Sequence, residues 1–464
     1  MLEKLGRNQD IIYVKARGNL SLCYHEHMCN VMEFMRDFYP ILEKRNIERP
    51  SDIFPGICKQ IDKDENLIEQ MVFSGVLVCK RWNSYYAFDM AKPPSRITSD
   101  SISEPESAFG SRDGFVENIK DNIALIRTRV RDSRLDIENI TIGRRSKTTV
   151  CLLSLGDVHN GSIKASIISK LKNIDIDAII SVDDVTAYLQ GKNLFPISQY
   201  VGSPDLACRR LFNGEFIIVI DRISNVIALP STMALTSRLS IDNLNVPLFS
   251  VLERLFVGLS FITATMFLGV LASFATWQSE SLSLRVLSIL KVTQTGVIFP
   301  IILEIVAVLA LFELYYFIGF RQSRLTVSST VVLIGGLIIG ENLVTSGVAG
   351  ILLMTFTAIT YLLTFVISSN VTVIAAISII RLCYLLSAYY FGIFGVTLVS
   401  VVVAAIYLKQ EAFGVHFFYP FIPLDINGLK QYFISTSSLD NKLRSSVLRV
   451  KNKTRRKVKN ENND

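Results

Sequence analysis

The stretch FVGLSFITATMFLGVLASFAT, from Phe256 to Thr276, decides the fold class of this chain. It has 21 residues and no charged side chain. That length is enough to cross a hydrocarbon core of about 30 Å as a helix that rises about 1.5 Å per residue. We therefore predict a membrane-spanning helix here. It marks the point where a polar N-terminal half gives way to an apolar region that reaches Leu408.

Further apolar segments follow this first span. They are Gly296–Phe320, Val331–Val348, Ala349–Ile367 and Thr372–Leu408. The last of these has 37 residues, enough for two short spans or one long bent helix, with a hinge expected in FGIFG at Phe391–Gly395. Together the segments predict an α-helical polytopic membrane domain of four to six spans in residues 246–425.

Four charged residues interrupt the apolar segments: Glu304, Glu313, Glu341 and Arg381. Charge at membrane depth costs several kcal/mol unless it is solvated or paired, so each of them needs a partner or a wet cavity. One hypothesis is that they line an ion pathway or a gate. The alternative is interhelical pairing, with Arg381 as the partner of the acids, or a position near the membrane interface.

Glycines are concentrated in the Val331–Val348 segment. Gly336 and Gly340 have the four-residue spacing that lets two helices approach closely, and Gly335 adds a further small residue beside them. We predict a helix-packing role for the three. The alternative is that they allow the helix to break around a permeation path.

The N-terminal half predicts a cytosolic α/β region with two subdomains, residues 1–95 and 113–245. Residues 96–112 contain Pro, Ser and charged residues and are expected to link them. Two strands are predicted around Met71–Met90, joined as a hairpin. In residues 146–231 strand and helix patterns alternate, which favours a mainly parallel or mixed sheet.

The C-terminal residues 426–464 form a basic tail. Between Lys442 and Lys459 there are nine basic residues and no acidic one, in a chain of net charge +7. We interpret the tail as a cytosolic topogenic signal that lies on anionic lipid. Nucleic-acid binding is not favoured, because no aromatic residue is interleaved there. A cytosolic tail and a cytosolic N-terminal region together require an even number of spans.

The sequence offers little enzyme chemistry. It has no Walker motif and no GxSxG motif. The segment from Cys23 to Cys29 contains two Cys and two His, but in a strand or a helix these cannot surround one ion. Gly143–Thr148 (GRRSKT) could bind an anion or form a solvated loop. We therefore predict no catalytic residues, no metal and no cofactor, and we expect the seven cysteines to be reduced thiols.

A series of short motifs occurs in order along the chain. The residues are Glu104, Pro105, Glu106, Asn122, Arg127, Gly143, Arg144, Arg145, Ser146, Lys147, Thr148, Pro204 and Asp205, followed by Gly336 and Gly340. This series resembles the A subunit of the GerA-type spore germinant receptors, as a divergent member. The resemblance covers about Gly75 to Asp425. Charge pairs typical of the family are replaced at Val201–Ser203 and at Tyr316–Ile318.

The resemblance implies a location, partners and an activity. It places the chain in the spore inner membrane, with the N-terminal domain and the tail on the spore core side. It implies a transporter-like B subunit that holds the nutrient, a lipoprotein C subunit, and a homo-oligomer, expected to be a pentamer. The oligomer would be a cation channel that opens on nutrient binding. The alternatives are a secondary transporter and a membrane scaffold without a pore.

Overall fold

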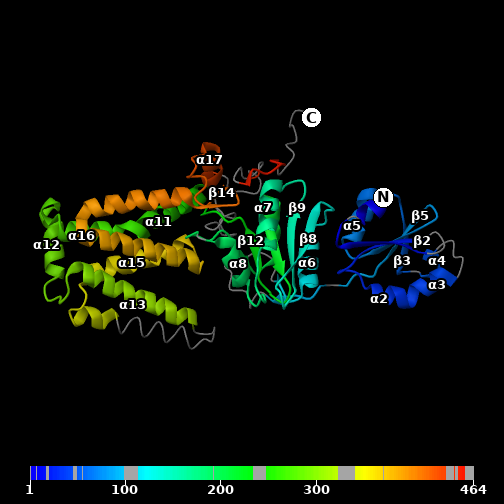
Figure 1. Cartoon of the computed structure of the whole chain (residues 1–464), viewed down its shortest axis with the longest axis horizontal. Helices are drawn as coiled ribbons and strands as arrows, with labels where there is room; N and C mark the ends of the chain where they lie inside the picture. Colours follow the sequence, from blue (N-terminus) through cyan, green and yellow to red (C-terminus); the bar gives the residue numbers. More distant parts are fainter. Residues whose placement is uncertain are drawn as a thin grey trace.

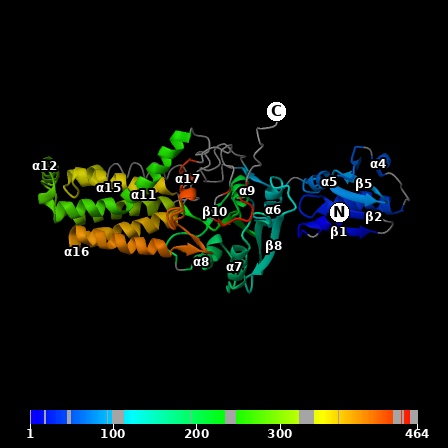
Figure 2. The ribbon, with the colours of Figure 1, turned by 90° about the horizontal axis from the view of Figure 1, so that it is seen from above.

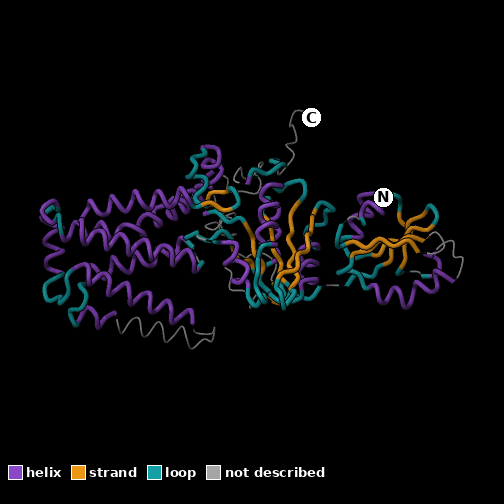
Figure 3. Tube along the Cα trace, viewed as in Figure 1, coloured by secondary structure: helices purple, strands orange, loops and turns teal. Residues whose placement is uncertain are grey.

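The structure is a computed structural model with three parts arranged along one long axis: a first α/β unit, a second α/β unit and a helix bundle (Figure 1). The same order is seen from above (Figure 2). Strands lie mostly in the two α/β units, and long helices lie in the bundle (Figure 3). The described residues are 2–6, 8–16, 20–44, 50–54, 56–92, 94–98, 113–191, 193–233, 247–321, 340–368, 370–434, 444 and 448–454.

The first unit contains a five-stranded sheet of order β1-β2-β4-β5-β3, and every pair in it is antiparallel. The strands are β1 (Ile11–Ala16), β2 (Leu20–His25), β3 (Cys58–Ile61), β4 (Leu77–Arg81) and β5 (Ser84–Phe88), and the short helices α1 (Leu2–Leu5), α4 (Pro50–Ile53) and α5 (Glu65–Val72) accompany them. The predicted hairpin is confirmed as β4–β5. Its alternating side chains feed two apolar clusters, because successive residues of a strand face opposite sides.

A continuous helical segment covers this unit between β2 and β3. It consists of α2 (Val31–Glu33), a π-helical turn (Phe34–Phe38) and α3 (Tyr39–Lys44). The N–H of Tyr39 donates to the carbonyl oxygen of Phe34, five residues back. This wider turn directly precedes Pro40, which has no N–H to donate. The helix therefore continues past the proline.

The second unit contains a five-stranded sheet of order β10-β12-β11-β9-β8. Its strands are β8 (Leu135–Ile142), β9 (Thr148–Leu155), β10 (Gln199–Val201), β11 (Phe216–Ile220) and β12 (Val226–Leu229). The helices of the unit are α6 (Ile119–Arg127), α7 (Gly161–Lys172), α8 (Val182–Gln190) and α9 (Pro204–Asn213). Two short strands, β6 (Ile97–Thr98) and β7 (Asp113–Gly114), form a separate pair. All pairs in the sheet are antiparallel. The expectation of a mainly parallel or mixed sheet is wrong, because β8–β9 and β11–β12 are direct hairpins without a crossover helix.

Among the described residues, the bundle has three helices that are long and apolar enough to cross a membrane, and one shorter apolar helix. The elements are α11 (Pro247–Thr276), α12 (Leu284–Thr293), α13 (Ile301–Arg321), α15 (Ile351–Ile367) and α16 (Val371–Lys409), followed by β13 (Glu411–Ala412), β14 (Val415–His416) and α17 (Ile426–Ile434). Residues 331–339 lie outside the described residues, so the count of four to six spans stays a prediction.

Helix α16 reverses direction at Gly392, within the expected FGIFG hinge. Gly392 has φ +58°, a conformation that favours glycine. The Tyr384 hydroxyl lies 3.1 Å from the Ser400 hydroxyl, whereas 16 residues of straight helix would span about 24 Å. Trp277 follows the end of α11, and its Nε1 donates to the carbonyl oxygen of Tyr389. The ring of Trp277 packs beside Gly392. Of the two alternatives left open by the sequence, the structure has the two antiparallel limbs.

Part of the basic tail packs on the second unit. Leu448 and Val450 belong to the apolar core of that unit and are 1% and 4% exposed. We expected this tail to lie on lipid. For the described segment the expectation is wrong, because its two apolar side chains are buried against protein.

Candidate functional site

A buried arginine inside the bundle gathers three helices around one positive charge. Arg381 on α16 is 1% exposed. Its Nε donates to the carbonyl oxygen of Ala264 on α11 at 2.7 Å, and its Nη2 donates to the Thr364 hydroxyl on α15 at 2.6 Å. Its guanidinium carbon lies 5.7 Å from the centre of the Tyr361 ring. Because guanidinium has five donors and packs on aromatic faces, this one side chain ties α11, α15 and α16 together.

Glu313 on α13 joins this arrangement through a hydroxyl of α16. Its Oε1 accepts a hydrogen bond from Ser378. Ser378 precedes Arg381 by three residues, so both side chains lie on the same side of α16 about one turn apart. The ion pair between the acids and Arg381, which the sequence left open as an alternative, is not formed among the described residues. Glu313 accepts from Ser378 one turn earlier, and Arg381 Nη1 has no hydrogen-bond partner.

These residues form a polar group between four predominantly apolar helices. We call it the arginine cluster, and its members are Ala264, Glu313, Tyr361, Thr364, Ser378 and Arg381. Burying a charge without a directly paired opposite charge is unfavourable, and such charges in membrane segments mark pathways and moving parts. The arginine cluster is therefore the candidate functional site of the bundle.

Glu304 is buried but has a different setting. It lies in the first turn of α13 and is fully buried. Its Oε1 accepts the backbone N–H of Gly350 at 2.6 Å, directly before α15. A Cβ on Gly350 would lie 2.9 Å from the carbonyl oxygen of Thr293, so the close approach requires glycine. This carboxylate provides the acceptor for the N–H of Gly350, the residue that precedes the first turn of α15, which is a structural role.

Glu341 and the glycines lie apart from the arginine cluster. Residues 340–345 are helical, and Glu341 is exposed. A Cβ on Gly340 would lie 3.3 Å from the Met354 side chain, so this glycine does face α15 closely. Gly335 and Gly336 lie outside the described residues. Of the four predicted charged residues, the structure brings together Glu313 and Arg381 only.

In the α/β region the family-motif residue Arg127 occupies the boundary of the two units. It is fully buried, and its Nε donates to Asp10 Oδ2 at 2.5 Å. Its Nη1 and Nη2 donate to the carbonyl oxygens of Asp132 and Leu135 at 2.7 and 2.9 Å. Burial alone would raise the pKa of Asp10, but the hydrogen bond from His25 and the charge of Arg127 outweigh it and lower that pKa to about 2. The ion pair joins β1 to α6 across 117 residues of sequence.

Two other motif residues also have structural contacts. Asn122 closes the loop before α6, accepting the Val116 N–H at 2.8 Å and donating to the Val116 carbonyl oxygen at 2.6 Å. Asp205, next to Pro204 at the start of α9, accepts from Arg129 Nε. The motif residues Glu104, Pro105 and Glu106 lie outside the described residues.

The Gly143–Thr148 turn packs against the loop after α7. Arg144 pairs with Asp175, its Nε donating at 2.6 Å, and the Arg145 N–H donates to the carbonyl oxygen of Asp177 at 2.8 Å. Both contacts fix the turn to its own unit. They support a folding role for this motif over an anion site.

An aromatic cluster at the junction of the second unit and the bundle was not predicted. Phe195 stacks on Phe417 with ring centres 5.0 Å apart and meets Phe418 edge-on at 5.1 Å. Phe418 in turn contacts Tyr407 at 4.1 Å and Phe261 at 5.9 Å. The run Phe417–Phe418, a few residues after the last apolar segment, was the available signal. These rings join the α7–α9 region to α11 and α16.

The cysteines of the Cys23–Cys29 segment are buried in two separate apolar cores. Cys23 and Cys29 belong to different apolar clusters, and His25 bonds Asp10 at 3.1 Å. Within the described part of the chain, no group of three or more His, Cys, Asp or Glu side chains is placed to hold a metal ion.

Comparison with known proteins gives consistent matches. Residues 1–447 match the family described as Bacillus/Clostridium GerA spore germination protein. The chain is 29% identical to spore germination protein XA of Bacillus anthracis over 90% of this chain and 85% of that protein. It is 25% identical to spore germination protein B1 of Bacillus subtilis, over 84% and 81%.

A solved structure was also matched, the N-terminal domain of the A subunit of the Bacillus megaterium spore germinant receptor GerK3. The identity is 21% and the TM-score 0.35, over 49% of this chain and 91% of that one. The family match spans nearly the whole chain. This protein therefore belongs to the Bacillus/Clostridium GerA spore germination protein family, a non-enzymatic family that includes the A subunits of germinant receptors.

Proposed function

We propose that this chain is the A subunit of a nutrient germinant receptor in the spore inner membrane, and that copies of it, as a pentamer, form a cation channel. Opening of the channel starts germination. The observation that carries this proposal is the arginine cluster. It places an acidic side chain, Glu313, in contact with the Ser378 hydroxyl between four predominantly apolar helices.

The chemistry of the cluster favours cations. A carboxylate with hydroxyl neighbours replaces part of the hydration shell of a cation, and rings of such acids select cations in pores. Arg381 donates to a carbonyl and a hydroxyl of neighbouring helices, so among the described contacts the charge of Glu313 is not taken up in a direct ion pair. Oligomerisation would bring several copies of Glu313 around one axis. Glu341, which is exposed, is the second gate candidate.

The partners in this proposal are a transporter-like B subunit, which binds the nutrient, and a lipoprotein C subunit. Both α/β units and the tail lie on the spore core side of the membrane. The basic residues between Lys442 and Lys459 support this orientation, because positive charge is retained on the cytosolic side.

Potassium efflux from liposomes tests the proposal. The chain is reconstituted alone and with its B and C partners, and efflux is followed on addition of candidate nutrients. We expect nutrient-dependent efflux that requires this chain and falls at least tenfold in Glu313→Gln, because the variant removes the charge while keeping a hydrogen-bonding group. Glu304→Gln is the matched control, since its amide oxygen can still accept the Gly350 N–H.

Two outcomes favour the alternatives. Nutrient uptake by the purified chain alone, without ion efflux, indicates a secondary transporter. Sealed liposomes under every condition, with the protein inserted and oligomeric, indicate a scaffold. Normal efflux in Glu313→Gln and Glu341→Gln at equal protein level contradicts the assignment of the pathway to these residues.

A further inference from the structure

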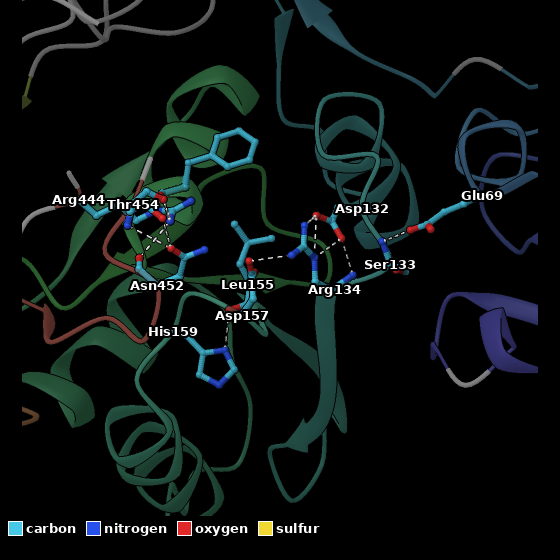
Figure 4. Close-up of polar contacts among 11 residues, drawn as sticks. Glu69, Asp132, Ser133, Arg134, Leu155, Asp157, His159, Arg444, Asn452 and Thr454 are labelled. Carbon is cyan, nitrogen blue, oxygen red and sulfur yellow. Dashed lines mark hydrogen bonds and ion pairs between the residues drawn. The ribbon is translucent and has the colours of Figure 1, made fainter. Parts of the chain in front are cut away.

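The segment that follows α17 returns to the second α/β unit and is folded onto it. We call Arg444 and Leu448–Thr454 the strap (Figure 4). Its two apolar side chains, Leu448 and Val450, are part of the same core as β9 and β11. The cationic side chains Lys451 and Lys453 of the strap are exposed. The strap is therefore held by apolar burial and backbone contacts rather than by its charge.

The seat of the strap has a specific shape. Gly214, which ends α9, has φ +94°, and a Cβ there would lie 2.4 Å from Val450 Cγ1 and 3.2 Å from Val158 Cγ1. Only glycine leaves room for the valine in this position. Beside it, the Lys451 N–H donates to the carbonyl oxygen of Val158 at 3.0 Å. The turn after β9 and the turn after α9 together form the seat.

Arg444 closes the strap on itself and on the seat. Its Nη1 donates to the carbonyl oxygens of Asn452 and Thr454 at 3.0 and 2.7 Å. Its backbone N–H donates to the carbonyl oxygen of Lys453 at 2.7 Å. Its Nε donates to the carbonyl oxygen of Phe212 on α9 at 2.8 Å. One arginine thus fixes both ends of the segment, which is how a short loop becomes a defined element.

The seat is also tied toward the first unit. Asp157, next to Val158, pairs with Arg134 at 3.0 Å, and the neighbouring Ser133 N–H donates to Glu69 on α5 at 2.8 Å (Figure 4). The turn that holds the strap therefore belongs to a line of contacts that reaches the N-terminal unit.

We propose that the strap is an intramolecular tether that fixes the second unit on the inner end of the bundle. It follows α17, which is bound to α11 by Arg254 through the carbonyl oxygen of Tyr432. The aromatic junction around Phe418 provides one attachment between the unit and the bundle, and the strap provides a second, on the α9 side.

Hydrogen exchange of the full-length protein in lipid nanodiscs tests the docking. The Val450→Asp variant buries an unpaired charge in the seat and should release the strap. We expect roughly tenfold or greater slowing of exchange for residues 448–454 in the unchanged protein, and its loss in Val450→Asp. Bundle peptides should not change. Lys453→Asp is the matched control, since it places the same carboxylate on an exposed position of the strap.

A distance measurement tests the tethering. Spin labels are placed on the native exposed Cys383 and on Tyr188→Cys of α8, in protein diluted with unlabelled copies. Release by Val450→Asp, or truncation after Leu443, should broaden the distance distribution, whereas truncation after Thr454 should not. Fast exchange of the strap in the unchanged protein, or an identical distribution after its release, overturns the proposal. Neither readout involves ion flux, so the result is independent of the channel.

Discussion

Two arginines are the largest fully buried side chains in the described chain, and they have opposite surroundings. Arg127, between the α/β units, has a carboxylate partner in Asp10, two carbonyl acceptors and the Phe73 ring 4.6 Å away. Arg381, in the bundle, contacts a carbonyl, a hydroxyl and the Tyr361 ring, and its Nη1 has no hydrogen-bond partner.

The difference predicts that one buried charge mainly stabilises the fold and that the other mainly serves function. Removing one partner of a buried ion pair leaves the other charge uncompensated, which costs several kcal/mol. A buried arginine without a carboxylate leaves no such charge behind when it is replaced by an apolar residue. Arg127 is therefore expected to dominate stability, and Arg381 to dominate function.

The largest expected effect is that of Arg127→Met. It leaves Asp10 buried without its cation, so we expect the first unit to lose about 3–5 kcal/mol of stability. The measurement is the urea dependence of thiol labelling at Cys23, which is fully buried on β2, with labelled peptides identified by mass spectrometry.

Arg131→Met serves as the matched variant for that labelling. Arg131 is exposed and follows Arg127 closely in sequence, so its loss should change stability by less than about 0.5 kcal/mol. Equal effects of the two substitutions would contradict the structural role of Arg127.

The second effect is acid destabilisation of the same site. The pKa of Asp10 is lowered in the folded chain to about 2, below its ordinary value of 3.8. A lowered pKa stabilises the fold above pH 3.8, and this stabilisation is lost as the pH falls toward 2, with a loss of about 2 kcal/mol. Labelling of Cys23 with a disulfide reagent active in acid measures it. The dependence should flatten in Asp10→Asn, and an unchanged slope there would assign the acid sensitivity elsewhere.

A smaller effect on stability is expected for Arg381→Met. No directly paired carboxylate is stranded, and hydrogen bonds between membrane helices contribute about 0.6 kcal/mol on average. Hydrogen exchange of α15 and α16 should therefore change by less than tenfold. If Arg381→Met destabilised α15 and α16 as much as Arg127→Met destabilises the first unit, the distinction between the two arginines would be wrong.

The smallest effect on stability is expected for replacement of Glu304, a buried acidic residue of the bundle. Glu304→Gln keeps an oxygen that accepts the Gly350 N–H, so the change should be a few tenths of a kcal/mol. Glu304→Leu should cost about 1 kcal/mol or more, because it leaves that buried N–H without an acceptor. Exchange rates at the start of α15 separate the two. A large loss in the glutamine variant would indicate that the charge itself is required.

The sequence was sufficient for features that depend on local pattern. The apolar runs predicted α11, α13 and α15, and the FGIFG motif marked the reversal at Gly392, because length and glycine placement are read directly from the chain. The sheet of the second unit was not predictable in this way, since strand direction depends on which strands pair. The Asp10–Arg127 pair and the seat of Val450 join residues far apart in sequence, and no local pattern identifies them.

Potassium efflux by Arg381→Met, compared with the unchanged chain and with Arg131→Met, is the most direct test of the account. All three are reconstituted with the B and C subunits at equal amounts of inserted protein. We predict that Arg381→Met retains the exchange protection of its helices and loses nutrient-dependent efflux, while Arg131→Met retains both. Normal efflux in Arg381→Met would contradict it, because the buried arginine of the bundle would then be as structural as the one between the α/β units.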